Sequence, residues 1–294
     1  MTLATQARAT ATASARTRWS RARSWSWHAP AMRKLRILLV LLATWEVGVR
    51  ALNVSPLIFP PASEVLRAWA SGLLSGEIVR YAWQSLLMLV LAMLIASAIA
   101  LVFVTGATLT RTGRDLLETL TSMFNPLPAI ALLPLALLWF GLGTNSLIFV
   151  LVHSVLWPLS LNAYTGFVTV PPTLVRVGQN IGLSGWGLVN GILLPAAFPY
   201  LLIGLKIGWA FAWRTVIAAE LVFGVAGERG GLGWYIYKNR YDLYTAEVFA
   251  GLLTIIAIGL LVESFVFQSI ERRTVVRWGM QARGGGDRVG AMEG

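Results

Sequence analysis

The sequence has no cysteine, only two histidines, and few charged residues, which make up 13% of its 294 positions. Without cysteine there can be no disulfide bond and no thiolate metal site. His28 and His153 have no metal-ligand spacing with each other, and no HExxH motif is present. The sequence also lacks a serine-nucleophile motif, a glycine-rich phosphate loop and a Walker lysine. We therefore expect no catalytic centre, no cofactor and no nucleotide bound by this chain itself.

Hydrophobic residues, in contrast, are abundant, at 56% of the chain, and the mean hydropathy is +0.68. That is more apolar surface than one globular core can bury, so lipid is the expected solvent. The net charge of +11 comes mostly from arginines in tails and loops beside apolar runs. This pattern is typical of membrane orientation and, without a recognised nucleic-acid-binding signature, it does not favour a nucleic-acid partner.

Six apolar segments are long enough to span a bilayer as helices that rise about 1.5 Å per residue. Their lengths fit helices rather than barrel strands. The sequence therefore predicts an all-α membrane protein with six transmembrane helices. The segments lie near residues 36–52, 82–107, 120–140, 145–168, 195–222 and 247–270.

The distribution of basic residues predicts how these spans are oriented. With the N-terminus inside, sixteen Lys and Arg residues of the tails and loops fall on the inner side and six on the outer side. The positive-inside rule then places both termini in the cytoplasm. Residues 1–35 are expected to be a disordered basic tail, held by anionic lipid rather than serving as a transit peptide. Residues 36–271 form the expected transmembrane domain, and 272–294 form a cytoplasmic C-terminal tail.

Two outer segments carry helix and turn signals. After Pro60 and Pro61, Ser63 is placed as an N-cap and Glu64 in the first turn, which predicts an interfacial helix on the outer surface. The outer loop at 224–244 has five glycines ahead of a Tyr/Trp cluster. This order predicts a turn followed by an aromatic belt at the membrane surface.

The third span contains the stretch "NPLPAIALLPLALLWFGLG", in which three prolines interrupt an apolar run. Pro126, Pro128 and Pro134 each remove a backbone donor and disfavour helix at the preceding residue, so this span is expected to be bent or partly unwound. Backbone carbonyls freed inside a bilayer need neighbouring helices or a wet cavity. The segment is therefore either part of a pathway lining or a kink that only shapes packing.

The fifth span places Lys206, Arg214 and Glu220 among apolar residues. A charge near the bilayer centre costs about 2.5–3.5 kcal/mol on insertion scales, so Arg214 is expected to face protein or water. Two roles stay open for it, an anion pathway or an ion pair with another helix. Lys206 is expected to extend to the cytoplasmic interface. The candidates for lining a pathway are Asn125, Pro126, Pro128, Trp139, Trp213, Arg214 and Glu220.

The fourth loop, "VPPTLVRVGQNIGLSGWGLVNGILLP", is unusually rich in turn residues for a segment between two apolar runs. Thr173 is expected to cap a short helix whose Leu174, Val177 and Ile181 share one face before Gly182 ends it. Ser184 is expected to cap a second short helix that reaches Pro195. Two short helices cannot bury an apolar stripe alone, so the loop either requires a partner or lies against the bilayer.

This loop resembles the EAA loop of bacterial binding-protein-dependent ABC importer permeases. Nine residues separate Gly182 from Ile192, and one residue separates Ile192 from Leu194 and Pro195, which matches the second half of that motif. A wider similarity covers residues 45–278 and includes "PLPAIALLPLALLWFGLG" and "GGLGWYIYKNR". The chain looks like the permeases for nitrate, taurine, alkanesulfonates and related small anions.

The resemblance implies a type I importer bundle in the bacterial inner membrane that translocates a small, anionic solute by alternating access. It implies a second copy of this chain, two cytoplasmic ATPase subunits that bind the ATP, and an extracytoplasmic solute-binding protein. In that family the loop at 171–194 docks into a groove of the ATPase. The implied ATPase-coupling residues are Leu174, Arg176, Val177, Ile181, Gly182, Leu183 and Ser184.

One departure from the family pattern concerns charge. The family's Glu-Ala-Ala corresponds here to Arg176, Val177 and Gly178, so a basic residue replaces an acidic one. The ATPase groove is then expected to present a different charge or to leave this position in solvent. The alternative function is a secondary transporter or channel that is not coupled to ATP. That alternative predicts an internal repeat with matched broken helices, and only one proline-broken span is evident.

Overall fold

In the computed structural model the described residues are 29–223 and 230–277, and all regular elements among them are helices. The chain divides into two units, Met1–Leu66 and Arg67–Gly294, which are described separately. The expected tail over residues 1–28, the start of the outer loop at 224–229 and the end of the C-terminal tail at 278–294 lie outside the described residues.

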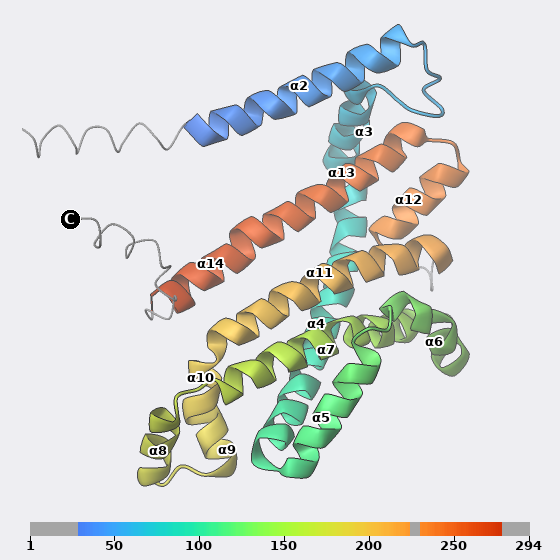
Figure 1. Cartoon of the computed structure of the whole chain (residues 1–294). Helices are drawn as coiled ribbons and strands as arrows, with labels where there is room; N and C mark the ends of the chain where they lie inside the picture. The colour runs from blue at the N-terminus through green and yellow to red at the C-terminus, as the bar shows by residue number, and fades with distance from the viewer. Residues whose placement is uncertain (1–28, 224–229, 278–294) are drawn as a thin grey trace, which may run out of the picture. The chain divides into compact units, whose positions relative to one another are not determined.

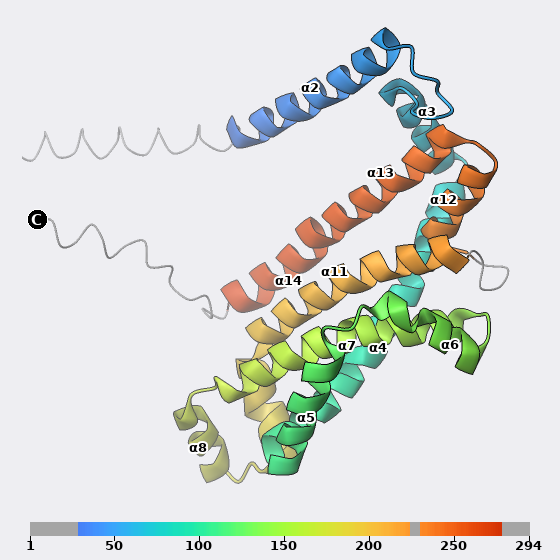
Figure 2. The same ribbon diagram turned by 45° about the vertical axis from the view of Figure 1, so that its right-hand side comes forward.

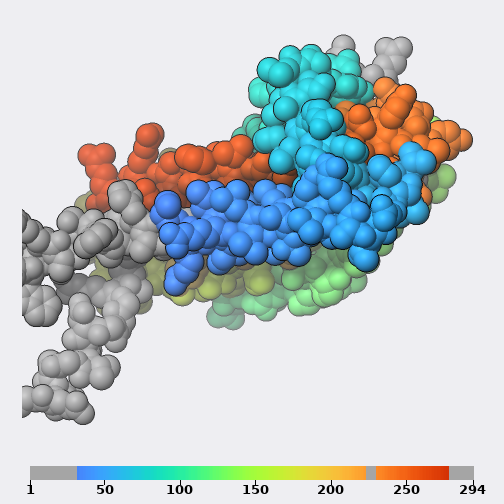
Figure 3. All heavy atoms as spheres, turned by 90° about the horizontal axis from the view of Figure 1, so that it is seen from above, coloured from blue at the N-terminus to red at the C-terminus, as the bar shows by residue number. Residues whose placement is uncertain are grey.

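The first unit is built on helix α2 (Ala29–Ala51). The helix begins ahead of the expected start near residue 36, because Pro30 is tolerated in a first helical turn and the next residues are good helix formers. Figure 3 shows α2 in blue as a ridge of side chains, and most of its large apolar residues are exposed. Beyond α2, the chain turns through Asn53 (φ 52°) toward the start of α3 (Ala62–Leu74).

The expected capping role of Ser63 is wrong. Helix α3 begins at Ala62, so Ser63 lies inside its first turn. The backbone N–H and the Oγ of Ser63 both donate hydrogen bonds to the carboxylate of Glu46, at 3.0 and 2.9 Å. Glu46 also accepts a hydrogen bond from Arg50 Nε at 2.7 Å. A carboxylate from α2 therefore caps α3, because charge-assisted bonds to backbone N–H groups are stronger than those a hydroxyl can make.

The second unit contains the long helices (Figure 1). The last of them continues from α13 without a break through π-helical turns, so the chain forms one element over residues 245–276. Apart from the short helices of the loop at 171–194, described below, the elements after α3 are α4 (Glu77–Leu109), α5 (Arg111–Phe124), η1 (Ala129–Leu132), α6 (Leu133–Phe140), α7 (Thr144–Val168), α11 (Phe198–Phe223), α12 (Leu232–Tyr241), α13 (Thr245–Leu261), η3 (Val262–Phe267), α14 (Gln268–Glu271) and η4 (Arg272–Val276).

The expected count of six spans is only partly supported. Among the described residues, four helices are long and apolar enough to cross a membrane: 77–109, 144–168, 198–222 and 245–276. The pair α5 and η1–α6 gives a fifth if it is one span, and it is bent by 91°. The first expected span forms α2, but it is not among these helices, since charged residues lie near both of its ends. The bend in the third expected span is confirmed.

Helix α7 packs against both α4 and α11, and the two views in Figures 1 and 2 show α7 and α11 side by side. Glycines allow the close approach of α11. A Cβ at Gly208 would lie 2.9 Å from Val155 Cγ1, and one at Gly204 would lie 3.0 Å from Leu159 Cδ1. Small residues four apart let helix backbones meet closely where lipid, rather than water, surrounds the bundle. This packing fixes the two walls of the pocket described below.

Candidate functional site

Helix α5 ends at Phe124, and the prolines that follow it turn the chain sharply. The N–H of Asn125 still donates to Thr121 O at 3.0 Å, but Pro126 and Pro128 have no N–H to continue the helix. Pro128 is extended, with φ −60° and ψ 121°, and the single turn of η1 begins immediately after it. The chain therefore changes direction at residues 125–128 and leaves part of its backbone out of helical hydrogen bonds.

Three aromatic rings hold this break against α7. The ring of Phe124 stacks on Trp157 with centroids 5.3 Å apart and planes 14° apart. The ring of His153 makes edge-to-face contacts with the same two rings, with centroids 6.1 Å from Phe124 and 6.0 Å from Trp157. Stacked and edge-to-face pairs add stability beyond area burial. The packing of these rings therefore helps to position the break.

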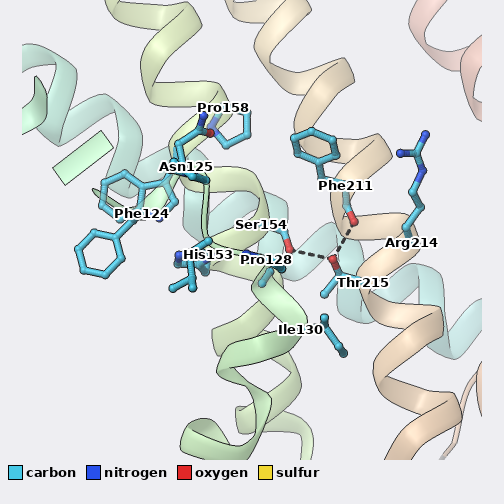
Figure 4. Close-up of a pocket in the computed structure, with 14 residues that line it drawn as sticks. Phe124, Asn125, Pro128, Ile130, His153, Ser154, Pro158, Phe211, Arg214 and Thr215 are labelled. Carbon is cyan, nitrogen blue, oxygen red and sulfur yellow. Dashed lines mark hydrogen bonds between the residues drawn. The ribbon is translucent and has the colours of Figure 1, made fainter. Parts of the chain in front are cut away.

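The break, α7 and α11 surround a cavity of about 300 Å³ (Figure 4). Each of the three elements contributes one wall, and the cavity lies wholly within the second unit. The walls are formed by residues 124–130 at the break, by His153, Ser154, Trp157 and Pro158 on α7, and by Phe211, Arg214 and Thr215 on α11. The cavity is the size of a small-ligand site.

Hydroxyl groups join the two helical walls. Ser154 Oγ donates to Thr215 Oγ1 at 3.1 Å, and Thr215 Oγ1 donates to the carbonyl of Phe211 at 2.9 Å (Figure 4). Pro158 lies inside α7 and has no N–H, so the carbonyl of Ser154 loses its usual helical donor. The wall therefore presents polar backbone and side-chain atoms within an apolar span.

Sequence reasoning missed the α7 wall. Ser154 and Pro158 lie on α7, and Phe211 and Thr215 lie beside Arg214 on α11. In the sequence, Pro158 inside the fourth apolar span, four residues after Ser154, could have indicated this wall.

Arg214 and the proline segment, which the sequence offered as separate candidates, line the same cavity. Figure 4 shows Arg214 on α11 and Asn125 on the opposite wall. The side chain of Arg214 is exposed, and within residues 29–223 and 230–277 it makes no ion pair. The expected structural ion pair is therefore not formed within the described part of this chain.

The other three pathway candidates lie outside this cavity. Trp139 is exposed on α6 and meets Phe149 edge-on, with centroids 5.8 Å apart. Trp213 is buried and stacks on Trp209 at 5.8 Å. Both rings therefore pack against aromatic neighbours.

Glu220 is 2% exposed and belongs to a polar cluster that joins three helices. Its carboxylate accepts hydrogen bonds from Ser85 Oγ on α4 at 3.0 Å and from the N–H of Gly233 on α12 at 2.8 Å. Ser85 Oγ accepts in turn from the N–H of Leu232 at 2.9 Å. These hydrogen-bond partners of Glu220 belong to the neighbouring helices of the bundle. The cluster is tightly packed, since a Cβ at Gly231 would lie 2.3 Å from Glu220 Oε1.

Lys206, which was expected to extend to the cytoplasmic interface, forms ion pairs with two carboxylates of the second unit. Its Nζ lies 2.8 Å from Glu271 Oε2 and 3.9 Å from Glu263 Oε1. These two carboxylates come from the helix over 245–276, so the ammonium joins α11 to the last helix of the bundle. The sequence could not reveal this pair, because its partners lie more than fifty positions away.

The loop at 171–194 forms two short helices, as predicted. These are α8 (Pro172–Asn180) and a helix made of α9 (Gly185–Leu188), η2 (Val189–Leu193) and α10 (Leu194–Ala196). The predicted apolar stripe is at the surface, with Leu174 44%, Val177 55% and Ile181 70% exposed. Gly182 has φ +85° and ends α8, because the left-handed region favours glycine.

Two predicted caps of these helices are wrong in detail. Helix α8 begins at Pro172 with Pro171 before it, and its first turn has no side-chain cap, so Thr173 does not have that role. Ser184 does precede α9, but its side chain makes no capping hydrogen bond. A proline at the start of a helix fixes φ without needing a cap.

Gly178, which stands at the last position of the family's Glu-Ala-Ala, lies at a close contact between the two short helices. Gly178 is buried, and a Cβ there would lie 2.8 Å from Leu188 Cδ1 and 2.9 Å from Ile192 Cγ1. The two short helices therefore approach more closely than alanine at this position would allow. Arg176 is exposed, so its charge is available to a partner.

Comparison with known proteins shows similarity to membrane components of transport systems. Residues 103–275 match the family described as "Binding-protein-dependent transport system inner membrane component". The chain is 31% identical over 241 residues to the taurine transport system permease protein TauC of Escherichia coli, covering 80% of this chain and 86% of TauC. It is 27% identical to the aliphatic sulfonates transport permease protein SsuC of Bacillus subtilis, covering 84% and 87%. With the nitrate import permease protein NrtB of Synechocystis it shares 30% over 152 residues, covering 52% and 54%.

A solved structure has a similar fold. A chain of the methionine ABC transporter MetNI, in inward-facing conformations, superposes with a TM-score of 0.53 at 20% identity. The match covers 67% of this chain and 95% of that chain. At this level of identity the likeness concerns the arrangement of helices and not the solute.

Proposed function

This chain belongs to the family of binding-protein-dependent transport system inner membrane components, and from that membership we propose how it recognises a solute and engages its partners. It is a multi-pass protein of the inner membrane and a permease subunit of an ABC importer. The family is a non-catalytic component of the transporter. In our proposal a separate ATPase subunit hydrolyses the ATP.

The proposed solute is a small oxyanion such as a sulfonate or nitrate. The names of the relatives support this class, since they transport taurine, aliphatic sulfonates and nitrate. The observation that carries the proposal is the cavity itself, which joins the proline break to Arg214. A guanidinium without a carboxylate partner attracts an anion, and a site inside the membrane strengthens that attraction.

We place the pathway between two copies of this chain. Arg214 and Phe211 are exposed at the α11 edge of the cavity, where one chain leaves it unclosed. A second copy facing this edge would complete the enclosure and shield Arg214 from lipid. The full complex of our proposal has two copies of this chain, two ATPase subunits and one extracytoplasmic solute-binding protein.

The loop at 171–194 is the proposed contact with the ATPase. Its stripe of Leu174, Val177 and Ile181 is apolar and exposed, which an isolated hydrated loop would not favour. Arg176 lies next to this stripe and is also exposed, so an acidic site in the ATPase groove would complement it. The proposed cycle is alternating access, in which ATPase closure moves this loop and rocks the bundle open toward the solute-binding protein.

The decisive experiment is uptake into proteoliposomes. This chain is reconstituted with the ATPase and the solute-binding protein that co-purify with it, and uptake of labelled taurine, ethanesulfonate and nitrate is measured. We expect uptake that requires both internal ATP and the binding protein. Uptake that persists without ATP would instead identify a secondary transporter or channel.

A further inference from the structure

Helix α5 lies alongside the spans of the bundle over most of its length. Leu117 on its buried side belongs to one apolar cluster with Ala163 and Phe167 of α7. Phe124 at its end stacks on Trp157, in the middle of α7. Helix α7 is one of the helices long and apolar enough to cross a membrane. The part of α5 from Leu117 to Phe124 is therefore placed at the depth of the bilayer.

One exposed side of α5 is nevertheless polar. A row of exposed residues recurs at intervals of three and four positions, which places them along one face of the helix: Arg111, Asp115, Glu118, Ser122 and Asn125. The row begins at the first residue of α5, and Asn125, which keeps helical φ and ψ, lines the cavity. This row, the polar face of α5, thus leads from one end of the bundle into the cavity.

A second exposed side of the same helix is apolar. Leu116 and Met123 are 49% and 64% exposed, and their spacing of seven residues places them on a common face beside the polar one. Lipid complements this apolar side. It does not complement the polar face, since a charged side chain near the bilayer centre costs about 2.5–3.5 kcal/mol on insertion scales.

The carboxylates of the polar face have no cation beside them. None of the ion pairs among residues 29–223 and 230–277 includes Asp115 or Glu118. A carboxylate that is removed from water needs a charged or hydrogen-bonding partner, whereas a hydrated one does not. Water is therefore the medium that fits this face of the helix.

The polar face differs from the cavity in its charge. The cavity has the cation of Arg214, while Asp115 and Glu118 are acidic. An anion is attracted by the first and repelled by the other two. In water the repulsion is only about 1 kcal/mol for unit charges 4 Å apart. It therefore opposes retention of an anion without blocking its movement.

The polar face reaches the end of the bundle that carries the loop at 171–194. Helix α4 ends at Leu109, next to the start of α5, and α7 ends at Val168, just before this loop. Leu117 and Phe167 share one cluster near these ends. A path along α5 from the cavity thus opens on the side where the loop contacts the ATPase in the proposed function.

We propose that the polar face of α5 lines a water-filled passage through which the solute leaves the cavity toward the ATPase side. The inference rests on the proposed function and extends it, because it assigns the release path to a helix that contributes only its end to the cavity. The second copy of the chain closes the passage opposite α5.

Thiol labelling tests the passage directly, because the chain has no cysteine of its own. Glu118→Cys and Ser122→Cys place a thiol on the polar face. Leu116→Cys and Met123→Cys are the matched controls on the apolar side, just before and just after them along the helix. The complex with the ATPase, in proteoliposomes without nucleotide, is treated on both sides with sulfonatoethyl methanethiosulfonate. This reagent carries a sulfonate and reacts with the thiolate, which forms in water and not in lipid.

The two thiols on the polar face are expected to react at least about tenfold faster than the two controls. Excluding a thiolate from water costs more than the about 1.4 kcal/mol that a tenfold difference in rate represents. Reaction at Ser122→Cys should also abolish ATP-dependent taurine uptake, because the attached group obstructs the passage. Reaction at Met123→Cys should leave the uptake of that variant unchanged. Equal rates on the two sides would overturn the proposal.

The outcomes separate this inference from the function on which it rests. If wild type imports taurine or nitrate with ATP but the two sides of α5 react equally, the passage is wrong and the importer function stands. If the polar face reacts selectively but no sulfonate or nitrate is imported, the passage is supported and the solute class is wrong. If Ser122→Cys does not react but forms a disulfide with the second copy on oxidation, the face is a dry contact and the passage is wrong.

Discussion

Glu220 on α11 accepts a hydrogen bond from the backbone N–H of Gly233 on α12 at 2.8 Å, and both groups are buried. Together with Ser85 on α4, this contact ties three helices at one point of the bundle. A charged residue within a span is often taken as part of a transport pathway. Here its partners are structural, and the cavity lies elsewhere along α11.

Replacing members of this cluster is therefore expected to lower stability before it affects solute recognition. Glu220→Ala leaves the N–H of Gly233 unpaired, and Ser85→Ala does the same to Leu232, at about 1–3 kcal/mol for each orphaned group. The thermal unfolding midpoint in detergent should fall in both variants. Glu118→Ala, at an exposed position on α5, is the control and should unfold at the wild-type temperature. An unchanged midpoint for Glu220→Ala would contradict the structural role.

Close packing between α7 and α11 predicts a sharp difference between two glycines. Gly208→Ala places a methyl group 2.9 Å from Val155 Cγ1, whereas Gly106→Ala on α4 meets nothing within 4 Å. Overpacking a tight interface costs about 1–3 kcal/mol, and alanine in an open helical site is stabilising relative to glycine. Thermal unfolding of the two variants should shift in opposite directions. Equal shifts would mean that α7 and α11 can separate without cost.

Arg214 is expected to act on the solute and not on assembly, because it has no ion pair within residues 29–223 and 230–277. Arg214→Ala should reduce taurine uptake at unchanged yield of the assembled complex. Arg214→Lys should restore part of that uptake, since a point charge is enough to attract an anion. The measurement is ATP-dependent uptake in complexes matched for assembly. Wild-type uptake by well-assembled Arg214→Ala would remove Arg214 from the pathway.

The exposed stripe of α8 is expected to bind the ATPase. Leu174→Asp and Val177→Asp place a charge in an apolar contact, so the ATPase should no longer co-purify while the permease keeps its thermal stability. Gln179→Asp adds the same charge at an exposed position on the opposite side of α8 and should leave the complex intact. Full co-purification with Leu174→Asp would be evidence against the loop as the contact surface.

Orientation can be measured independently of activity. Because sixteen basic residues fall on one side of the predicted spans and six on the other, the positive-inside rule places Arg176 and Arg273 in the cytoplasm and Tyr237 outside. A reporter enzyme that is active only outside should work when fused after Tyr237 and should be silent after Arg176 or Arg273. Activity after Arg176 would exclude the proposed topology.

Local features of the sequence determined where most of the helices lie and where one of them is broken. The lengths of the apolar runs predicted where the long helices lie, and Pro126 and Pro128 predicted the break, because a proline removes a donor whatever surrounds it. The stripe of α8 and its end at Gly182 followed from helical spacing and from the left-handed φ that glycine allows.

Only the tertiary structure decided which side chains meet. The sequence placed Arg214 and Glu220 in one span, but it could not say that Arg214 lines the cavity while Glu220 bonds to Ser85, because that depends on how α11 is rotated against α4 and α7. Lys206 likewise pairs with Glu271 through packing of distant segments. Such contacts are set by the joint packing of several helices, and no single stretch of sequence contains that information.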